Sequence, residues 1–224
     1  METTVISLGG SLIVPAEIDV DFLKRFRAIM IEYAEGNRAV IVCGGGMVCR
    51  LYQNAAKTIT AISDDDLDWI GIRATKLNAE LVRAIFGDLA HHKITDDPLA
   101  KIKTNKRIII GSGFAPGASS DNDAVLLAKN LGAKRVINLS NVDYVYDKDP
   151  RFFPDAKMFS KMSWEQYRAI CGDRWKPGAN LPFDPTASRN AEKHGIKVFI
   201  ISGHDLKNFT DALYGRAFKG TVIG

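Results

Sequence analysis

Two glycine-rich turns near the start of the sequence have the composition of phosphate-binding loops. The first lies in VISLGGSLI (5–13) and the second in GGGMVCR (44–50). Each follows a short apolar run, and the backbone N–H groups of such a turn are available to an anion. Arg50 adds a guanidinium that can hold two phosphate oxygens; the alternative is a tight turn with a solvated arginine. The first turn contains no lysine, which leaves open the cation that would neutralise a phosphate there.

A third segment, GSGFAPGASSDNDA (111–124), runs from a predicted strand into a predicted helix. The hydroxyls of Ser119 and Ser120 suit an anion or a sugar edge, and an acid at the helix start, Asp121 or Asp123, could orient a cation near a transferred group. The alternative is a capping arrangement in which Ser120 or Asp121 caps the helix and the other acid favours its dipole.

Two further polar segments each have a functional and a structural interpretation. Asp68 begins DWIGIRATKLN (68–78), where its carboxylate could accept hydrogen bonds from ribose hydroxyls, although a helix cap is the preferred prediction. In SNVDYVYDKDP (140–150), Tyr144 or Tyr146 could line an adenine pocket, whereas the alternative is a surface turn. The adjacent histidines of HHKITDDP (91–98) fit no metal-ligand spacing, so no metal-binding residue is predicted.

The elements that would position these groups alternate between strands and helices. Val- and Ile-rich runs predict strands, and amphipathic spacing predicts helices, the first with Asp21 as its cap and the last ending at Gly132. Such a pattern indicates an α/β fold whose parallel sheet is covered on both faces and whose ligands bind beyond the carboxyl ends of the strands. The predicted strands are 4–10, 39–46, 107–113, 135–140 and 197–203, and the predicted helices are 21–35, 47–57, 68–86 and 121–132.

Composition is that of an ordinary globular protein. The chain has 224 residues, of which 46% are hydrophobic and 25% charged, with a net charge of +4 and no long basic run. The charge pattern argues against a nucleic-acid partner, and the absence of an apolar stretch of roughly 18–20 residues argues against a membrane span. Three unevenly spaced cysteines argue against a disulfide framework. Because no secretory signal is recognised, we expect a cytoplasmic protein. No compositional break occurs, so we expect a single domain over 1–224, with an excursion from the sheet at about 143–185 that forms a lid or nucleotide pocket.

Taken in order, the motifs resemble the amino-acid-kinase family, and within it the archaeal-type branch that phosphorylates UMP. LGGSLIVP and GGGMVCR resemble the two phosphate loops, DWIGIRATKLN the D-x-x-G-x-x-x-T-x-x-N helix, and NVDYVYDKDP the nucleotide motif. PGASSDNDA, FDPTA and GTVIG resemble the remaining family segments. The resemblance implies a three-layer αβα sandwich with a mainly parallel sheet. It also implies transfer of the γ-phosphoryl group of ATP to UMP in pyrimidine nucleotide biosynthesis, with Mg²⁺, in a homohexamer.

The resemblance also implies residue roles. ATP would contact Gly10, Ser11, Gly46, Arg50, Ser140, Asn141, Tyr146 and Asp149. UMP would contact Gly45, Asp68, Phe114, Ala115, Pro116, Gly117, Ala118, Ser119 and Ser120. The catalytic groups would be Arg50, Asp121, Asp184 and Lys176.

The chain departs from the family pattern at the first loop, where Ser7 stands at a position that many members fill with lysine. Lys176, in RWKPGAN, is the candidate for the missing cation; the alternative is a solvated lysine before a turn. Two other functions stay open: a kinase of N-acetylglutamate or isopentenyl phosphate on the same fold, and a non-catalytic protein that binds or stores nucleotides or oxyanions.

Overall fold

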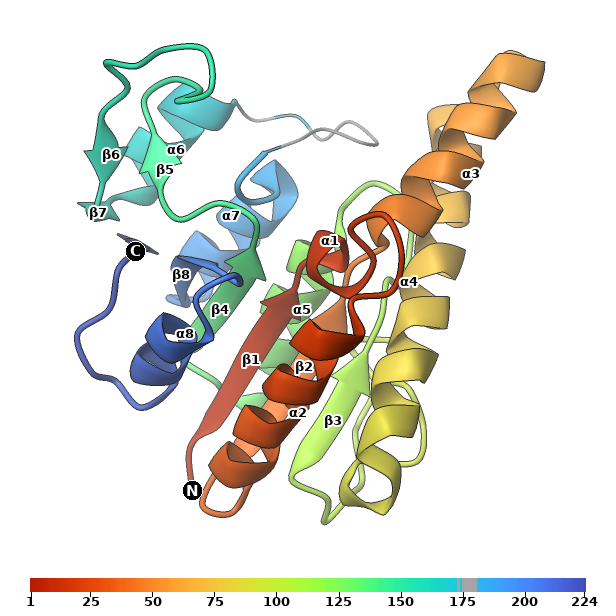
Figure 1. Cartoon of the computed structure of the whole chain (residues 1–224), viewed down its shortest axis with the longest axis vertical. Coiled ribbons are helices and arrows are strands. Elements are labelled where there is room, and N and C mark those ends of the chain that lie inside the picture. The colour runs from red at the N-terminus through yellow and green to blue at the C-terminus, as the bar shows by residue number, and fades with distance from the viewer. Residues whose placement is uncertain (173, 175–180) are drawn as a thin grey trace.

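A seven-stranded sheet forms the centre of the computed structural model, which describes residues 1–172, 174 and 181–224 (Figure 1). In spatial order its strands are β3 (Ile108–Gly111), β2 (Arg38–Cys43), β1 (Thr3–Leu8), β4 (Arg135–Ser140), β8 (Lys197–Ser202), β9 (Thr221–Ile223) and β7 (Lys161–Met162). The first five are mutually parallel, and β9 reverses direction beside β8. The carboxyl ends of these five strands therefore meet at one edge, as the sequence predicts.

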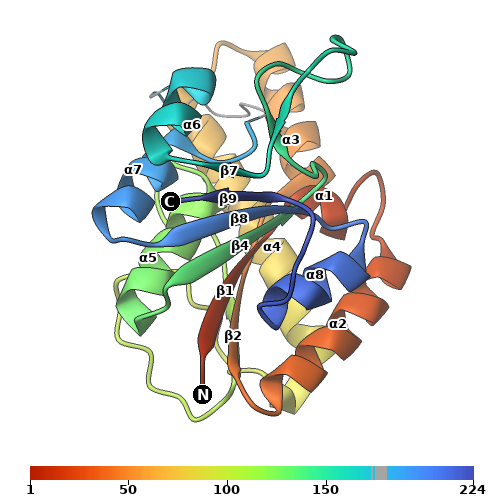
Figure 2. The ribbon, with the colours of Figure 1, turned by 90° about the vertical axis from the view of Figure 1, so that its left-hand side faces the viewer.

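Alternate residues of the strands pack against two separate layers of helices. Ile6 and Ile41 face α2 (Val20–Ala34), α4 (Asp64–Phe86) and α8 (Leu206–Leu213), whereas Val5 and Val40 face α5 (Ser120–Leu131), α6 (Trp164–Cys171) and α7 (Pro185–Lys193). Figure 2 shows the sheet between these two layers. Continuous Val and Ile runs are buried on both faces because both faces are covered. The predicted three-layer αβα sandwich is confirmed.

Two of the predicted helix starts are wrong by a short distance. Helix α2 is capped by Asp19, whose carboxylate accepts the Phe22 N–H at 2.8 Å, and not by Asp21. Helix α4 is capped by Ser63. Asp68 consequently lies inside α4, one turn beyond its start, and the prediction that it caps the helix is wrong. A helix can begin at any of several neighbouring cap-forming residues, and packing selects among them.

Helix α5 also begins slightly earlier than expected. Ser119 is its cap, accepting the Asp121 N–H at 3.2 Å, rather than Ser120 or Asp121. The predicted end at Gly132 is confirmed, since this glycine has φ 71° and closes the helix in the left-handed conformation.

Short elements carry too little pattern for detection and were not predicted. They include α1 (Gly10–Ile13), η1 (Gly87–Leu89) and the antiparallel pair β5 (Val145–Tyr146) and β6 (Met158–Phe159). Strand β7 falls within the excursion predicted for 143–185, yet it pairs with β9 at the edge of the central sheet. The described part of the excursion therefore does not leave the sheet entirely.

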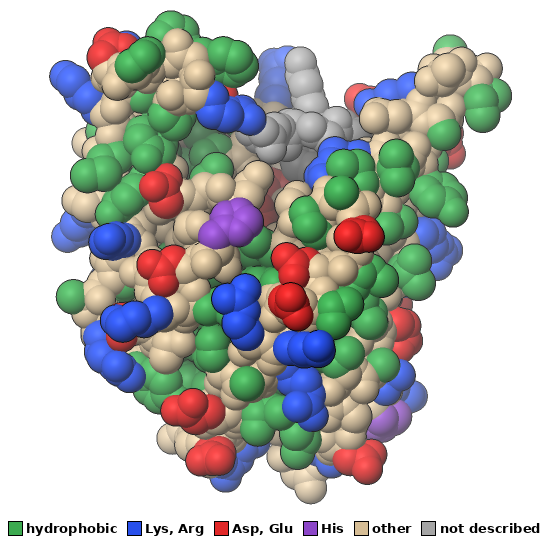
Figure 3. All heavy atoms as spheres, viewed as in Figure 1, with side chains coloured by type: hydrophobic (Ala, Val, Ile, Leu, Met, Phe, Trp, Pro, Cys, Tyr) green, Lys and Arg blue, Asp and Glu red, His purple; other side chains and the backbone are tan. Residues whose placement is uncertain are grey.

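Helix α3 (Gly46–Ile59) extends past the sheet edge beside the start of α4 (Figure 1). Hydrophobic side chains gather on this projection in the space-filling view (Figure 3), and Leu51, Tyr52 and Ile59 are among the exposed large hydrophobic residues. Within the described part of the chain, no helix is both long and apolar enough to cross a membrane.

Candidate active site

The two glycine loops touch each other. Gly10 follows β1 and Gly44–Gly46 follows β2, and these strands are parallel neighbours. A Cβ added at Gly44 would lie 2.6 Å from the Gly10 backbone nitrogen, and one added at Gly10 would collide with the Gly46 nitrogen. Gly46 also has φ +63°. Side chains are excluded here because the two backbones pack directly on each other.

One face of α4 holds the second glycine loop in place. Asp68, Gly71, Thr75 and Asn78 follow one another at intervals of three or four residues and so share a face of the helix. Asn78 is buried, and its side-chain amide donates to the carbonyl oxygens of Gly44 at 2.8 Å and Gly45 at 3.1 Å. These bonds satisfy two carbonyl groups at the turn.

The same face of α4 holds the segment that follows β3. The Gly113 N–H donates to the Thr75 hydroxyl at 2.8 Å, and the Gly117 N–H donates to the Asp68 carboxylate at 2.7 Å. A Cβ on Gly113 would lie 2.9 Å from the Thr75 oxygen. The helix therefore aligns two loops from different strands. Sequence reasoning gave no role to Thr75 or Asn78, although the helical spacing from Asp68 was a signal.

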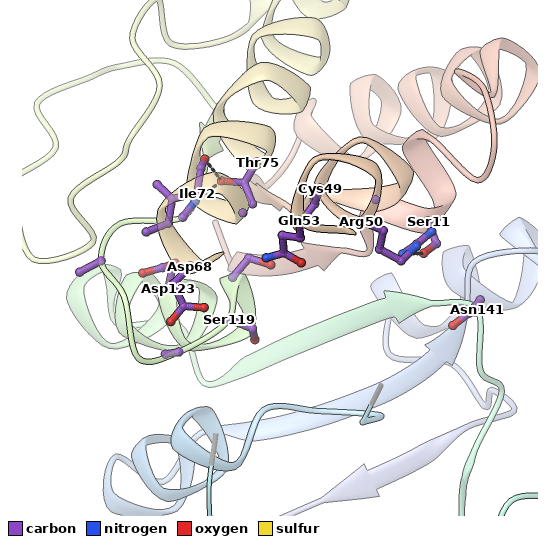
Figure 4. Close-up of a pocket in the computed structure, with 17 residues that line it drawn as sticks. Ser11, Cys49, Arg50, Gln53, Asp68, Ile72, Thr75, Ser119, Asp123 and Asn141 are labelled. Carbon is purple, nitrogen blue, oxygen red and sulfur yellow. Dashed lines mark hydrogen bonds between the residues drawn. The ribbon is translucent and has the colours of Figure 1, made fainter. Parts of the chain in front are cut away.

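A first cavity of about 460 Å³ lies between α3, α4 and the start of α5 (Figure 4). At one end, Arg50 donates to the Ser11 hydroxyl at 3.3 Å. Asp68, Asp123 and Ile72 lie at the opposite end in the view of Figure 4. The cavity is lined by Ser11, Gly45, Gly46, Cys49, Arg50, Gln53, Asp68, Gly71, Ile72, Thr75, Gly113, Ala115, Ala118, Ser119, Ser120, Asp123 and Asn141. Of these, sequence reasoning did not predict Cys49, Gln53, Gly71, Ile72, Thr75 or Gly113 as site residues.

A second cavity of about 600 Å³ lies between the first glycine loop and residues of the 140–151, 170–171 and 181–182 segments. Among its lining residues are Gly10, Asp121, Ser140, Tyr144, Tyr146, Lys148, Asp149 and Arg151. Ser119, Ser120 and Asn141 line both cavities. The two cavities therefore meet at the amino-terminal end of α5.

Buried Ser7 and half-buried Asp121 form a hydrogen-bonded pair beside this junction. The Ser7 hydroxyl donates to Asp121 Oδ1 at 2.7 Å, and the Asp184 N–H donates to Asp121 Oδ2 at 3.3 Å. Burial, reinforced by the nearby Asp184 charge, raises the pKa of Asp121 to about 6. At the position where the family often has lysine, this chain thus supplies a neutral hydroxyl to the carboxyl.

Asp184 connects the start of α5 to α7. Its carboxylate accepts the N–H of Ser119 at 2.5 Å and caps α7 by accepting the N–H of Ala187 at 2.9 Å. The side chain is buried, and burial raises its pKa. Asp184 lines neither cavity, so it positions Ser119 rather than facing either space.

Asp123 lies in the first turn of α5 and lines the first cavity. Its carboxylate accepts the Phe114 N–H at 3.3 Å. Burial raises the pKa of this carboxyl to about 7.

The residues expected to bind ligands divide between the two spaces. Of the residues expected to contact ATP, Ser11, Gly46 and Arg50 line the first cavity, Gly10, Ser140, Tyr146 and Asp149 line the second, and Asn141 lines both. Gly45, Asp68, Ala115, Ala118, Ser119 and Ser120, expected to contact UMP, all line the first cavity, whereas Phe114, Pro116 and Gly117 do not. Lys176 lies outside the described residues. Ser7 and Asn138, which also line the second cavity, were not among the predicted site residues.

The tyrosines of the 140–150 segment face a cavity rather than forming only a surface turn. Tyr144 and Tyr146 pack edge to face with ring centroids 6.4 Å apart, and the Tyr146 hydroxyl donates to Asp143 at 3.1 Å. Asp149 forms an ion pair with Arg151 at 2.7 Å, and these contacts lower its pKa. Flat aromatic rings beside a polar rim suit a nucleotide base.

The comparisons with known proteins agree with this architecture. The model of the amino acid kinase family matches residues 2–202. A relative from Thermococcus kodakarensis, named uridylate kinase, is 33% identical over 222 residues, which cover 98% of each chain. The crystal structure of uridylate kinase from Archaeoglobus fulgidus superposes with a TM-score of 0.84 at 32% identity, covering 100% of both chains. UMP kinase from Ureaplasma parvum, with a TM-score of 0.80 at 18% identity, shares the fold.

The match to the family model extends over most of the chain and includes both glycine loops, the α4 face and the start of α5. These are the segments that build the junction between the two cavities. By this full-length agreement in sequence and fold, the chain belongs to the amino acid kinase family.

Proposed function

We propose that this protein is a UMP kinase, which transfers the γ-phosphoryl group of ATP to UMP and yields ADP and UDP for pyrimidine nucleotide biosynthesis. UMP would occupy the first cavity and ATP the second. Support for the acceptor comes from the relatives, which are named uridylate kinases over nearly the full length of the chain.

The observation that carries the proposal is the meeting of the two cavities at Ser119, Ser120 and Asn141. Phosphoryl transfer needs a donor and an acceptor held in line at close range, and asks little covalent chemistry of the protein. The amino-terminal end of α5 lies at the meeting point and carries the positive end of a helix dipole. Two anionic groups would be brought together there against their repulsion.

Arg50 is the proposed cation of the acceptor side. It lines the first cavity beside the second glycine loop and reaches Ser11 of the first loop. A guanidinium in this place can contact phosphate oxygens of both substrates. On the donor side, Lys148 and Arg151 line the second cavity. The role of Lys176 in the transfer stays a prediction from the sequence.

Asp121 and Asp184 would act by position. Asp184 holds the Ser119 N–H, and Asp121 links Ser7 of β1 to the same region. Together they fix the start of α5 between the two nucleotides. Fixed donors and dipoles stabilise a transferring group better than groups that must reorganise.

Mg²⁺ is proposed to enter as part of the nucleotide substrate. The ion prefers oxygen ligands and keeps several waters, so phosphate oxygens would supply much of its coordination. The described residues include no group of three or more His, Cys, Asp or Glu side chains arranged to hold a metal. When bound to ATP, the ion would neutralise phosphate charge.

A coupled assay of ADP release tests the function. Purified protein is supplied with MgATP and, separately, with UMP, CMP, N-acetylglutamate and isopentenyl phosphate. We expect the highest kcat/KM with UMP. Turnover with N-acetylglutamate or isopentenyl phosphate alone would identify a different kinase of this fold, and ATP binding without turnover of any acceptor would support the binding or storage function.

Arg50→Ala provides the matched site test. We expect the affinity for UMP in calorimetric titration to fall about tenfold or more, because a charged hydrogen bond contributes roughly 1.5–3 kcal/mol. Arg73→Ala, an exposed arginine on α4 outside both cavities, is the control and is expected to bind UMP normally. Wild-type UMP affinity in Arg50→Ala would remove this residue from the phosphate site.

We also propose a cytoplasmic homo-oligomer, a hexamer by family resemblance, with contacts made through the long helices. Exposed Tyr52 on α3 and exposed Trp69 and Leu77 on α4 support such contacts, because large apolar side chains in this number favour a protein interface. Light scattering after size exclusion would give the mass of the assembly, and a monomer at micromolar concentration would contradict the proposal.

A further inference from the structure

We propose that Asp123 is a specificity-determining residue of the first cavity, where its carboxyl accepts a hydrogen bond from the ring N–H of the acceptor base. The inference rests on the proposed function and deepens it by naming the group on the acceptor that the protein reads. Asp123 lies outside the set of residues that the family resemblance implies, so the assignment comes from its place in this structure.

The first step is that Asp123 is buried but sparsely bonded. The residue is only 7% exposed. Among the described residues, the Phe114 N–H is its hydrogen-bond donor, at a long 3.3 Å and to Oδ2. A carboxylate offers about four acceptor sites. A buried carboxylate whose acceptor sites lack hydrogen-bond donors costs free energy. A donor on a bound ligand would fill the acceptor sites that the protein itself leaves unfilled.

The second step is the position of Asp123 along the cavity. In Figure 4 it lies far from Arg50 and Ser11, which mark the phosphate end, and on the opposite side of Ser119. Two hydrogen bonds hold this end of the cavity in place. The Phe114 N–H donates to the Asp123 carboxylate, and the N–H of the adjacent Gly113 donates to the Thr75 hydroxyl of α4. An acceptor whose phosphate lies at the glycine loop would place its base at the Asp123 end.

The third step is the chemistry of this end. Ile72, Ala115 and Ala118 line the cavity with small or apolar surfaces that suit the faces of a planar ring. The Asp68 carboxylate at this end accepts the Gly117 N–H, whereas the Asp123 carboxyl has acceptor sites left for a donor on the ring edge. Uracil carries one ring N–H, at N3, between two carbonyl oxygens. A carboxylate accepts from that N–H, and a protonated carboxyl can in addition donate to a neighbouring carbonyl.

A purely structural role explains less of the geometry. A negatively charged side chain in the first turn of a helix interacts favourably with the helix dipole. An exposed side chain can make this interaction as well, so the interaction does not explain the burial of Asp123. The cap of α5 is already supplied by Ser119. Burial of Asp123 beside the cavity is therefore not needed to cap α5, whereas recognition of a ligand accounts for it.

The test compares UMP with 3-methyluridine 5′-monophosphate, which lacks the N3–H. For the wild type we expect kcat/KM to favour UMP by about tenfold or more, because a site built for a hydrogen bond rejects an analogue that cannot make it. In Asp123→Ala this preference is expected to shrink to about threefold or less, since the acceptor is gone and the methyl group gains room. Asp123→Asn retains an acceptor oxygen and should keep most of the preference.

The exposed Asp88→Ala is the control and should keep the wild-type ratio. An unchanged ratio in Asp123→Ala would overturn the inference while leaving UMP kinase activity established. If that variant fails to fold, the wild type still decides, because equal use of UMP and the methylated analogue overturns the inference alone. A wild type that binds ATP but does not phosphorylate UMP overturns both the proposed function and the inference.

Discussion

Replacing Asp123 with asparagine should make the stability of the protein less dependent on pH. In the folded protein, burial raises the pKa of this carboxyl from 3.8 to about 7. The folded state therefore holds a proton that the unfolded chain releases between these pH values. The stability from that proton is fully present below about pH 4 and is lost as the pH rises to about 7.

The size of the effect follows from the shift. A pKa that is about 3 units higher in the folded than in the unfolded state corresponds to a loss of roughly 4 kcal/mol in unfolding free energy between pH 4 and pH 8. Asp121 and Asp184 contribute repulsion to the same carboxyl, so its neutralisation also relieves them. Asparagine never ionises but buries a polar amide, which costs some free energy. We therefore expect Asp123→Asn to be about 1–3 kcal/mol more stable than the wild type at pH 8 and about 1–3 kcal/mol less stable than it at pH 4, because the cost of the buried amide does not depend on pH.

Urea unfolding at a series of pH values between 4 and 8 measures this difference. Asp88→Asn, at an exposed position, is the control and is expected to change stability by less than about 0.5 kcal/mol at any of these pH values. The reasoning would be refuted by an Asp123→Asn variant whose unfolding free energy runs parallel to that of the wild type across the pH range.

Two other variants test the links between segments. Ser7→Ala removes the 2.7 Å hydrogen bond that favours the Asp121 carboxylate, so the pKa of Asp121 should rise above about 6. The acidic limb of the kcat/KM profile for UMP should then move to higher pH; an unmoved limb would show that Asp121 does not control it. Asn78→Ala leaves the carbonyl groups of Gly44 and Gly45 without their donor, and should cost about 1–3 kcal/mol in urea unfolding and weaken UMP binding in calorimetry. Asn54→Ala, on the exposed surface of α3, is its control, and equal losses in the two variants would contradict the role of Asn78.

The fold class and the loops that build the site could be inferred from the amino-acid sequence alone. The run that ends at Cys43 is apolar at consecutive positions. Such a run is typical of a strand whose two faces are both covered by other elements. Glycines at the ends of β1 and β2 marked the loops, because only glycine permits the backbones to touch. Exact helix starts escaped prediction, since Asp19 and Asp21 are chemically equivalent caps until packing selects one.

The way in which these parts combine became visible in the folded protein. Ser7 and Asp121 are separated by 114 positions in the chain, and Ser119 and Asp184 by 65, yet each pair is hydrogen-bonded. No local pattern encodes such contacts, because they arise when parallel strands bring their carboxyl ends to one edge. The same is true of Asp123, whose place in the sequence is compatible with a solvated helix start. Its burial in the first cavity depends on how α5 packs against the segment held by α4, and this packing gives the carboxyl its raised pKa and its proposed role.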